Sequence, residues 1–216
     1  MVLMLKGQTD IISAILIVII AIGLVSTAYT WGIPLIQKQQ DTALVERVMN
    51  YFSSSSENSI EKRIISVASN GGEETFSIDV SGLWQLVPNS TTSIDSNSLS
   101  FNFFARVSNI ATNLTSGQWV SLNGVSCPPP LGIISEEPYA ICARADSVGN
   151  GFNINYKVQF RPLQSSNQKY EILLVQHPSG FNSSTSRAIR IQRGSSYSTI
   201  LDGQNFIITE VKILLG

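Results

Sequence analysis

Few side chains in this sequence have the types and spacing that catalysis or metal binding requires. The single histidine, His177, lies in the turn-like stretch QHPSG, and no GxSxG motif accompanies it. The acidic pairs Glu73-Glu74 and Glu136-Glu137, the latter followed by Asp146, match no glycosidase or calcium-loop spacing. We therefore expect no enzyme, no cofactor and no metal site.

Two cysteines, Cys127 and Cys142, bracket a proline-rich stretch. In an oxidising compartment they would form a disulfide worth on the order of 3 kcal/mol, and otherwise they would remain two separate buried thiols. They lack CxxC spacing and neighbouring histidines, so they are poor metal ligands. We predict a disulfide if the chain is exported, with an ordered surface loop over residues 123–138.

The composition limits the classes of partner. Charged residues make up 13% of the chain and the net charge is −1, against roughly 25% charged residues in an average protein. No basic surface suggests nucleic acid as a partner. The residues beyond the N-terminal apolar stretch, about 180, can close an independent core.

Residues 11–31 carry no charge. As a helix they would be roughly 31 Å long, which matches the thickness of a bilayer core. Tyr29 and Trp31 lie at the far end, where aromatic rings favour the membrane interface. Gly32 and Pro34 are then expected to interrupt or kink the helix.

This stretch has three interpretations. A secretory signal peptide would be cleaved near Ser26-Thr27-Ala28, although only one basic residue precedes it and Asp10 adjoins the apolar run. An uncleaved membrane anchor is compatible with every residue of the run. In the third interpretation, a short leader is removed before the helix and the helix is retained.

The residues Lys6-Gly7-Gln8, placed just before the apolar run, resemble the class III signal peptide of archaeal pilins and archaellins. The resemblance covers about residues 5–36. It implies that a prepilin-type peptidase cuts between Gly7 and Gln8, so that residues 1–7 are the signal peptide. The retained helix would lie first in the membrane and later in a filament core, among copies of the chain or related pilins. Many type IV pilins have glutamate as the fifth mature residue, whereas this chain has Ile12, as in archaellins that lack that glutamate.

The helix also contains small residues, which allow neighbouring helices to approach closely. Together with the acidic residue that precedes the run, they are our candidates for the assembly helix: Asp10, Ser13, Ala14, Ala21 and Gly23. Lys6 favours a cytoplasmic N-terminus, which would place the rest of the chain outside the cell.

Residues 35–52 predict an amphipathic helix, because apolar side chains recur every three or four positions. These side chains are Leu44, Val45, Val48, Met49 and Phe52. The serine-rich tract that follows is a plausible stop. We therefore expect one long hydrophobic and amphipathic helix over residues 8–56, with a membrane span at about 11–31.

From about residue 63 the apolar pattern has the period of two that is typical of strands. We expect a hairpin around Asn70-Gly71-Gly72, followed by strands at LWQLVP, SLSFNFFARV, GFNINYKVQF, YEILLVQ, RAIRIQ and NFIITEVKILL. The last is apolar on both faces and should be central in its sheet. Trp84, Phe101, Phe103 and Trp119 are expected in the core. The predicted fold class is α+β, with the long N-terminal helix followed by an all-β sandwich or barrel over residues 63–216.

Three N-x-S/T sequons, at Asn89, Asn113 and Asn182, are candidates for glycosylation in an exported protein. We expect a structural subunit of an archaeal type IV pilus-like surface filament, with adhesion as a further role. The alternative is a membrane-anchored extracellular β-domain binding protein, or a minor pilin or pseudopilin of a secretion or uptake system. Both interpretations place the chain in the cell membrane with an extracellular domain, or in a surface filament. The expected partners are the membrane, copies of the chain or related pilins, and a prepilin-type peptidase.

Overall fold

The computed structural model describes residues 4–89, 93–107, 118–201 and 204–216, and for residues 4–10 and Leu201 it describes the backbone alone. The chain divides into two compact units, Met1–Asp41 and Thr42–Gly216. We call the second unit the head. The apolar side chains that form the core all belong to the head.

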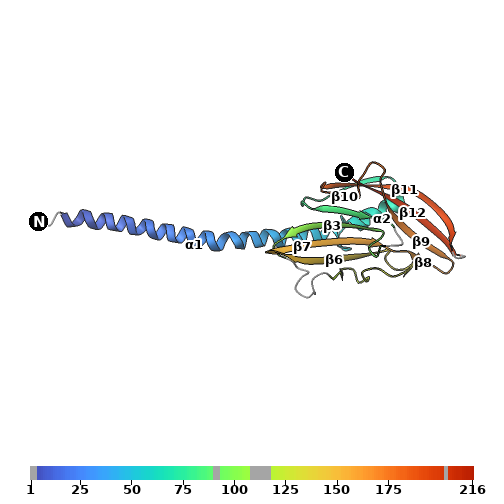
Figure 1. Cartoon of the computed structure of the whole chain (residues 1–216), viewed down its shortest axis with the longest axis horizontal. Coiled ribbons are helices and arrows are strands. Elements are labelled where there is room, and N and C mark those ends of the chain that lie inside the picture. The colour runs from blue at the N-terminus through green and yellow to red at the C-terminus, as the bar shows by residue number, and fades with distance from the viewer. Residues whose placement is uncertain (1–3, 90–92, 108–117, 202–203) are drawn as a thin grey trace. The chain divides into compact units, whose positions relative to one another are not determined.

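A single helix, α1 (Met4–Tyr51), forms the N-terminal part of the chain (Figure 1). It continues through Pro34, so the helix is not interrupted there, and the alternative expectation of a kink stays a prediction. Proline removes one backbone hydrogen bond, and the bonds of the flanking turns maintain the helix. The amphipathic pattern of residues 35–52 is confirmed, because Val45, Val48 and Phe52 are buried. The helix ends just before the serine-rich tract, as predicted.

The expected hairpin around residues 70–72 was also wrong, because residues Ile60–Asn70 form a second helix, α2. The apolar residues Ile60, Ile64 and Val67 are three or four positions apart and all are buried, which is the spacing of a helix face. Gly71 ends α2 with φ of 79°, and its N–H donates to the Val67 carbonyl oxygen at 3.0 Å. This positive φ suits glycine, which has no Cβ, at a helix end.

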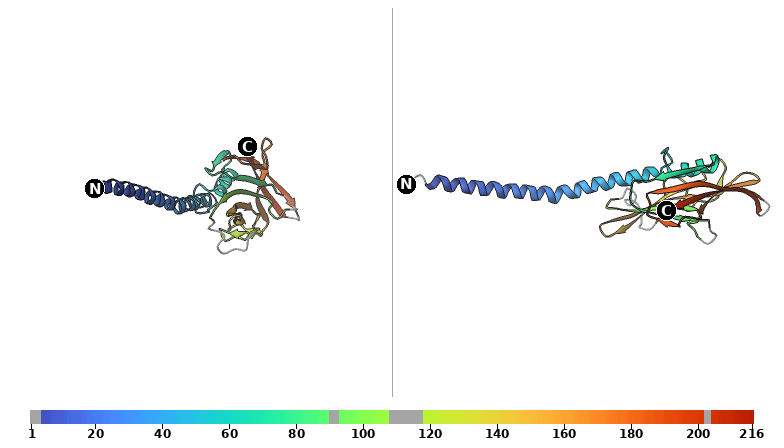
Figure 2. Two further views of the ribbon diagram at one scale, coloured as in Figure 1. Left: turned by 60° about the vertical axis from the view of Figure 1, so that its left-hand side comes forward. Right: turned by 90° about the horizontal axis from the view of Figure 1, so that it is seen from above.

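Two six-stranded sheets make up the rest of the head, which confirms the α+β class with a β-sandwich head (Figures 1 and 2). Sheet A has the order β1-β11-β12-β9-β8-β5, and sheet B the order β10-β2-β3-β7-β6-β4. The strands of sheet A are β1 (Glu73–Ser77), β5 (Gly132–Ile133), β8 (Leu163–Gln164), β9 (Gln168–Gln176), β11 (Ala188–Leu201) and β12 (Gln204–Leu215). Those of sheet B are β2 (Leu83–Val87), β3 (Ser98–Ala105), β4 (Val120–Ser121), β6 (Tyr139–Val148), β7 (Gly151–Phe160) and β10 (Ser183–Ser184).

Strand β12 lies between β11 and β9, so its predicted central position is confirmed. It runs antiparallel to β11 and parallel to β9. On β7 the predicted alternation also holds, because Ile154, Tyr156 and Val158 are fully buried. Helix α2 contacts β1, β11 and β12 of sheet A.

The core joins both sheets and both helices. Phe52, which directly follows α1, stacks on Tyr156 of β7 with ring centroids 5.4 Å apart, and its ring centroid lies 6.2 Å from that of Trp84 of β2. Trp84 in turn contacts Phe101 of β3. The core also includes side chains of α2 and sheet A, among them Ile64, Leu174, Ile191, Val211 and Ile213.

A buried asparagine connects the two sheets. Asn97, just before β3, is 3% exposed and has a left-handed φ of 56°. Its side-chain amide donates to the Ile172 carbonyl oxygen and accepts from the Leu174 N–H of β9, both at 2.8 Å. Its own carbonyl oxygen accepts from the Phe160 N–H at 3.0 Å. One residue thus satisfies backbone groups of strands in both sheets.

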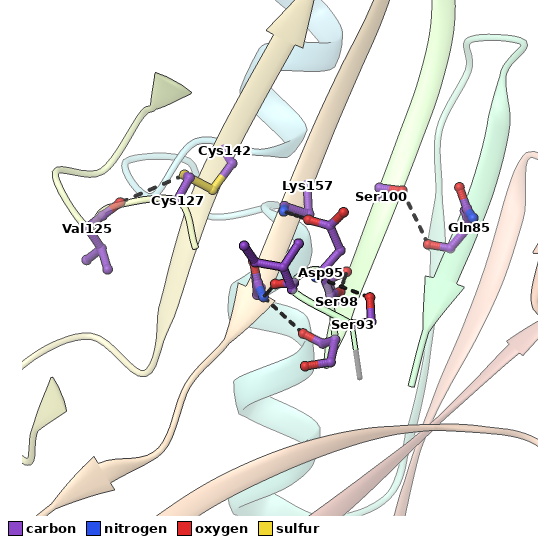
Figure 3. Close-up of polar contacts among 12 residues, drawn as sticks. Gln85, Ser93, Asp95, Ser98, Ser100, Val125, Cys127, Cys142 and Lys157 are labelled. Atoms are coloured by element: carbon purple, nitrogen blue, oxygen red, sulfur yellow. Dashed lines mark hydrogen bonds and ion pairs between the residues drawn. A yellow bond between two sulfur atoms is a disulfide. The ribbon is translucent and has the colours of Figure 1, made fainter. Parts of the chain in front are cut away.

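The outer face of sheet B is covered in part by the segment before β3. Lys157 is 2% exposed, although the alternation on β7 turns it away from the core. Its Nζ lies 2.5 Å from Asp95 Oδ1 (Figure 3) and 4.2 Å from the centre of the Trp119 ring. Trp119 therefore packs on the outer face of this sheet, and its expected place in the core was wrong. The positive charge of Lys157 is balanced by Asp95 and by the face of the indole ring.

Candidate assembly helix and head sites

The first candidate site is the apolar part of α1, residues 11–36. Six consecutive side chains, Ile15, Leu16, Ile17, Val18, Ile19 and Ile20, are each more than half exposed. Because a helical turn takes 3.6 residues, these six cover every side of the helix. The most apolar window of the helix has a mean hydropathy of 2.8 and none of it is buried. By length and composition, this helix could cross a membrane.

Two hydroxyl groups within this stretch, those of Thr27 and Thr30, bond back to the helix itself. Thr27 Oγ1 donates to the Gly23 carbonyl oxygen at 2.8 Å, and Thr30 Oγ1 lies 3.1 Å from the Ser26 carbonyl oxygen. Threonines that bond in this way present their methyl groups and no unpaired hydroxyl. These two threonines therefore suit surroundings without water, where an unpaired polar group is costly.

The small residues predicted for assembly lie on more than one side of the helix. Ala14 and Ala21 are seven positions apart and share one side, whereas Gly23 lies about 200° around the helix from Ala21. All three, and Ser13, are exposed. A Cβ added at Gly23 would meet no atom within 4 Å. Helices could therefore approach α1 from several directions, as packing among several copies requires.

The predicted processing residues Lys6, Gly7 and Gln8, and the predicted Asp10, lie within the helical backbone of α1. Their side chains are outside the described part of the structure. Of the three sequons, Asn89 and Asn182 are exposed in the head and Asn113 lies outside the described residues. Asn182 is next to β10, and its carbonyl oxygen accepts from the Leu86 N–H of β2 at 2.7 Å.

Cys127 and Cys142 form a disulfide, with Cα atoms 6.2 Å apart, which confirms the predicted pairing. Cys142 lies on β6, so the bond ties the loop that contains Cys127 to sheet B (Figure 3). The loop is ordered by short strand pairing as well, since β5 runs parallel to β8.

The residues considered for catalysis or metal binding lie in separate parts of the head, apart from the sequence neighbours Glu73-Glu74 and Glu136-Glu137. His177 lies in a turn, where its Nδ1 accepts from the Ser179 N–H. Four of the five acidic residues pair with separate arginines: Glu73 with Arg190, Glu74 with Arg63, Asp146 with Arg144 and Glu136 with Arg161. The fifth, Glu137, accepts from the side-chain amide of Asn123. Within the described ranges, no three His, Cys, Asp or Glu side chains are close enough to hold a metal ion.

Sequence reasoning missed two groups of polar residues in the head. Asn123 and Arg161 meet Glu136 and Glu137 beside the disulfide. Elsewhere, Glu61 of α2 is fully buried, and neither of its carboxylate oxygens has a hydrogen-bond partner among the described residues. Burial raises the pKa of Glu61, while the nearby Ser59 and Lys62 oppose the rise. An acidic residue in the first turn of a helix is ordinarily a solvated residue, so no local pattern signals this burial.

Comparisons of the chain with protein-family models, with curated proteins and with solved structures find no match.

Proposed function

We propose that the chain is a structural subunit of an archaeal type IV pilus-like surface filament, assembled through α1. The observation that carries the proposal is the exposure of apolar side chains on every side of residues 11–36. Burial of these side chains would contribute on the order of 20 kcal/mol or more. A helix that is apolar all round must be surrounded by lipid or by other apolar helices.

The resemblance of Lys6-Gly7-Gln8 to a class III signal peptide supports the same function. Under this proposal the prepilin-type peptidase removes residues 1–7, the helix holds the subunit in the membrane, and copies then pack through it in the filament. The head lies outside the cell and coats the filament. The mechanism requires apolar burial alone, with no reaction and no cofactor.

The test is the intact mass and the N-terminal sequence of the protein from its native membrane, followed by electron microscopy of the cell surface. We expect a start at Gln8 and filaments that contain the protein. A start near Tyr29 would mean a secreted protein and would overturn the proposal. Retention of Met1, or a Gln8 start without filaments, would leave a membrane-anchored head and also overturn assembly.

A further inference from the structure

A polar cavity of about 450 Å³ lies beside the disulfide of the head. Its polar lining comes from one loop, over residues 123–137, and from a single residue more distant in the sequence: Asn123, Ser126, Ser135, Glu136, Glu137 and Arg161. Val125 and Pro130 add apolar surface. The volume lies within the range of small-molecule sites, about 300–1,000 Å³.

Arg161, just after β7, is a buried donor in the wall of this cavity. It is 5% exposed, and its Nε donates to the Glu137 carbonyl oxygen at 3.0 Å. Its other two nitrogens donate to the Pro130 carbonyl oxygen at 3.3 Å and to Glu136 Oε2 at 3.1 Å. Because a guanidinium has five N–H groups, two remain without a partner among the described residues.

The acceptors of the cavity are held in place by the backbone. Glu136 Oε2 also accepts from the Ile133 N–H at 3.1 Å, and no described residue bonds its second oxygen. Asn123 Nδ2 donates to Glu137 Oε2 at 2.9 Å, while Asn123 Oδ1 accepts from the Ile141 N–H at 3.0 Å. Both carboxylates are therefore oriented before any ligand arrives.

The disulfide stiffens the rim of the cavity. Cys127 follows the lining residue Ser126 and is bonded to Cys142 of β6. Asn123 also donates to the Tyr139 carbonyl oxygen at 3.2 Å, at the first residue of β6. A rim fixed at both points loses little conformational freedom when a ligand binds.

The charges of the cavity select the class of ligand. The positive guanidinium of Arg161 would repel a cation, and the negative carboxylates of Glu136 and Glu137 would repel an anion. A neutral molecule whose hydroxyl groups both donate and accept can bond to both kinds of group. Its C–H faces could rest on Val125 and Pro130.

We propose that this cavity binds a neutral saccharide of one or two hexose units. The vicinal hydroxyl groups of the sugar would donate to Glu136 and Glu137 and accept from Arg161. The proposal concerns the head alone and does not depend on filament assembly by α1.

The test uses the full chain in micelles of a detergent without a sugar headgroup, because an alkyl glycoside would compete. Saturation-transfer-difference NMR would be recorded with glucose, galactose, mannose, N-acetylglucosamine, maltose, lactose and cellobiose as probes. We expect saturable binding of at least one of these sugars. Calorimetric titration of the same sample with CaCl₂ should give no saturable heat of binding.

Two variants locate the binding. Ser135→Trp fills the cavity from an exposed position without a described side-chain bond, and it should abolish binding. Glu137→Gln keeps the shape but removes a charged acceptor, and should weaken binding by about tenfold or more. Ser179→Trp, at an exposed turn outside the cavity lining, is the matched control and should bind as the unaltered chain does.

Thermal unfolding would confirm that each variant is folded. Absence of saturable binding by every probe would overturn the proposal. Equal binding by Ser135→Trp would do the same, because the sugar would then sit elsewhere. Saturable calcium binding that is lost in Glu137→Gln, without sugar binding, would replace the saccharide site with a cation site.

Discussion

The two halves of α1 contain similar apolar residues but bury them very differently. In the first half, Ile17 is 66% exposed and Leu24 is 68% exposed, whereas in the last turns Val45 and Val48 are 1% and 0% exposed. The last turns alternate apolar with polar side chains and pack one side against the head. The first half has apolar side chains on every side, so a single packing face could not bury them. The sequence pattern thus distinguishes a helical segment that completes the core of the head from one whose apolar side chains are exposed on every side.

The largest expected effect comes from placing a charge in the exposed half. Gly23→Lys should abolish filament assembly or retention in the membrane, because a lysine at the centre of a membrane helix costs about 2.5–3.5 kcal/mol and would be repeated in every copy. Ala43→Lys, on the exposed side of the last turns, is the control and should assemble normally. Membrane fractionation and electron microscopy would measure both. Normal filaments from Gly23→Lys would contradict the assumed difference between the halves.

Shortening a buried and an exposed side chain tests the same difference between the halves of α1 through the free energy of unfolding of the head. Phe52→Ala should lower the free energy of unfolding of the head by about 3–5 kcal/mol, because Phe52 is fully buried against Trp84 and Tyr156. Trp31→Ala removes a larger side chain that is 80% exposed and should leave the unfolding of the head unchanged. Urea denaturation of the full chain in micelles compares the two. Equal losses of unfolding free energy in both variants would mean that the first half of α1 also stabilises the head.

Asn97, which connects the two sheets, should contribute less to the stability of the head than Phe52 does. Asn97→Ala should destabilise the head by about 2–4 kcal/mol, since it leaves the Leu174 N–H and the Ile172 carbonyl oxygen unpaired and keeps a left-handed φ. Asn97→Gly tolerates that φ but loses the same bonds, so it separates the two effects. Hydrogen exchange at the Leu174 amide should accelerate in both variants. Unchanged exchange would show that this contact is dispensable.

The smallest expected effect is the pH dependence that the buried carboxyl of Glu61 gives to the stability of the head. Because burial raises the pKa of Glu61 above its ordinary 4.5, the folded head is most favoured while the carboxyl is protonated. The folded head loses stability as the pH rises from about 4.5, the ordinary pKa, through the higher pKa of Glu61 in the folded head. Glu61→Gln should therefore be more stable than the unaltered chain at pH 7 and equal to it near pH 4. Glu46→Gln, at an exposed position, is the matched control for the loss of one carboxylate. The stability curves of the two variants against pH provide the check.

Periodicity was enough to predict the strands that have one buried face. In β7, Ile154, Tyr156 and Val158 alternate with polar residues, as the pleat requires. The exposed half of α1 was equally clear, because no polar stripe interrupts it. Helix α2 was missed because Ile64, Ile65 and Val67 are β-branched, and such residues favour strands when they are considered locally. The helical spacing of the buried face extends from Ile60 through Ile64 to Val67, so a window that begins at residue 63 does not contain it.

The head sites depend on contacts that no local pattern contains. Lys157 lies on a strand face that would ordinarily meet solvent, but Asp95 and Trp119, from other parts of the chain, cover it. The cavity beside the disulfide similarly needs Asn123 and Arg161 to meet the Glu136-Glu137 pair. The sequence identified those two acids and the cysteines, but strand pairing over long distances decides what lies beside them.

Strand β12 occupies the middle of sheet A, yet its residues, 204–215, leave the ribosome after those of every other described strand. Until they emerge, β9 and β11 have no strand between them, and their open edges can pair with other nascent chains. The head therefore closes only after β12 has been synthesised. A premature stop before Val211 would remove three fully buried side chains, Val211, Ile213 and Leu215, and should produce an aggregating chain rather than a slightly shorter head.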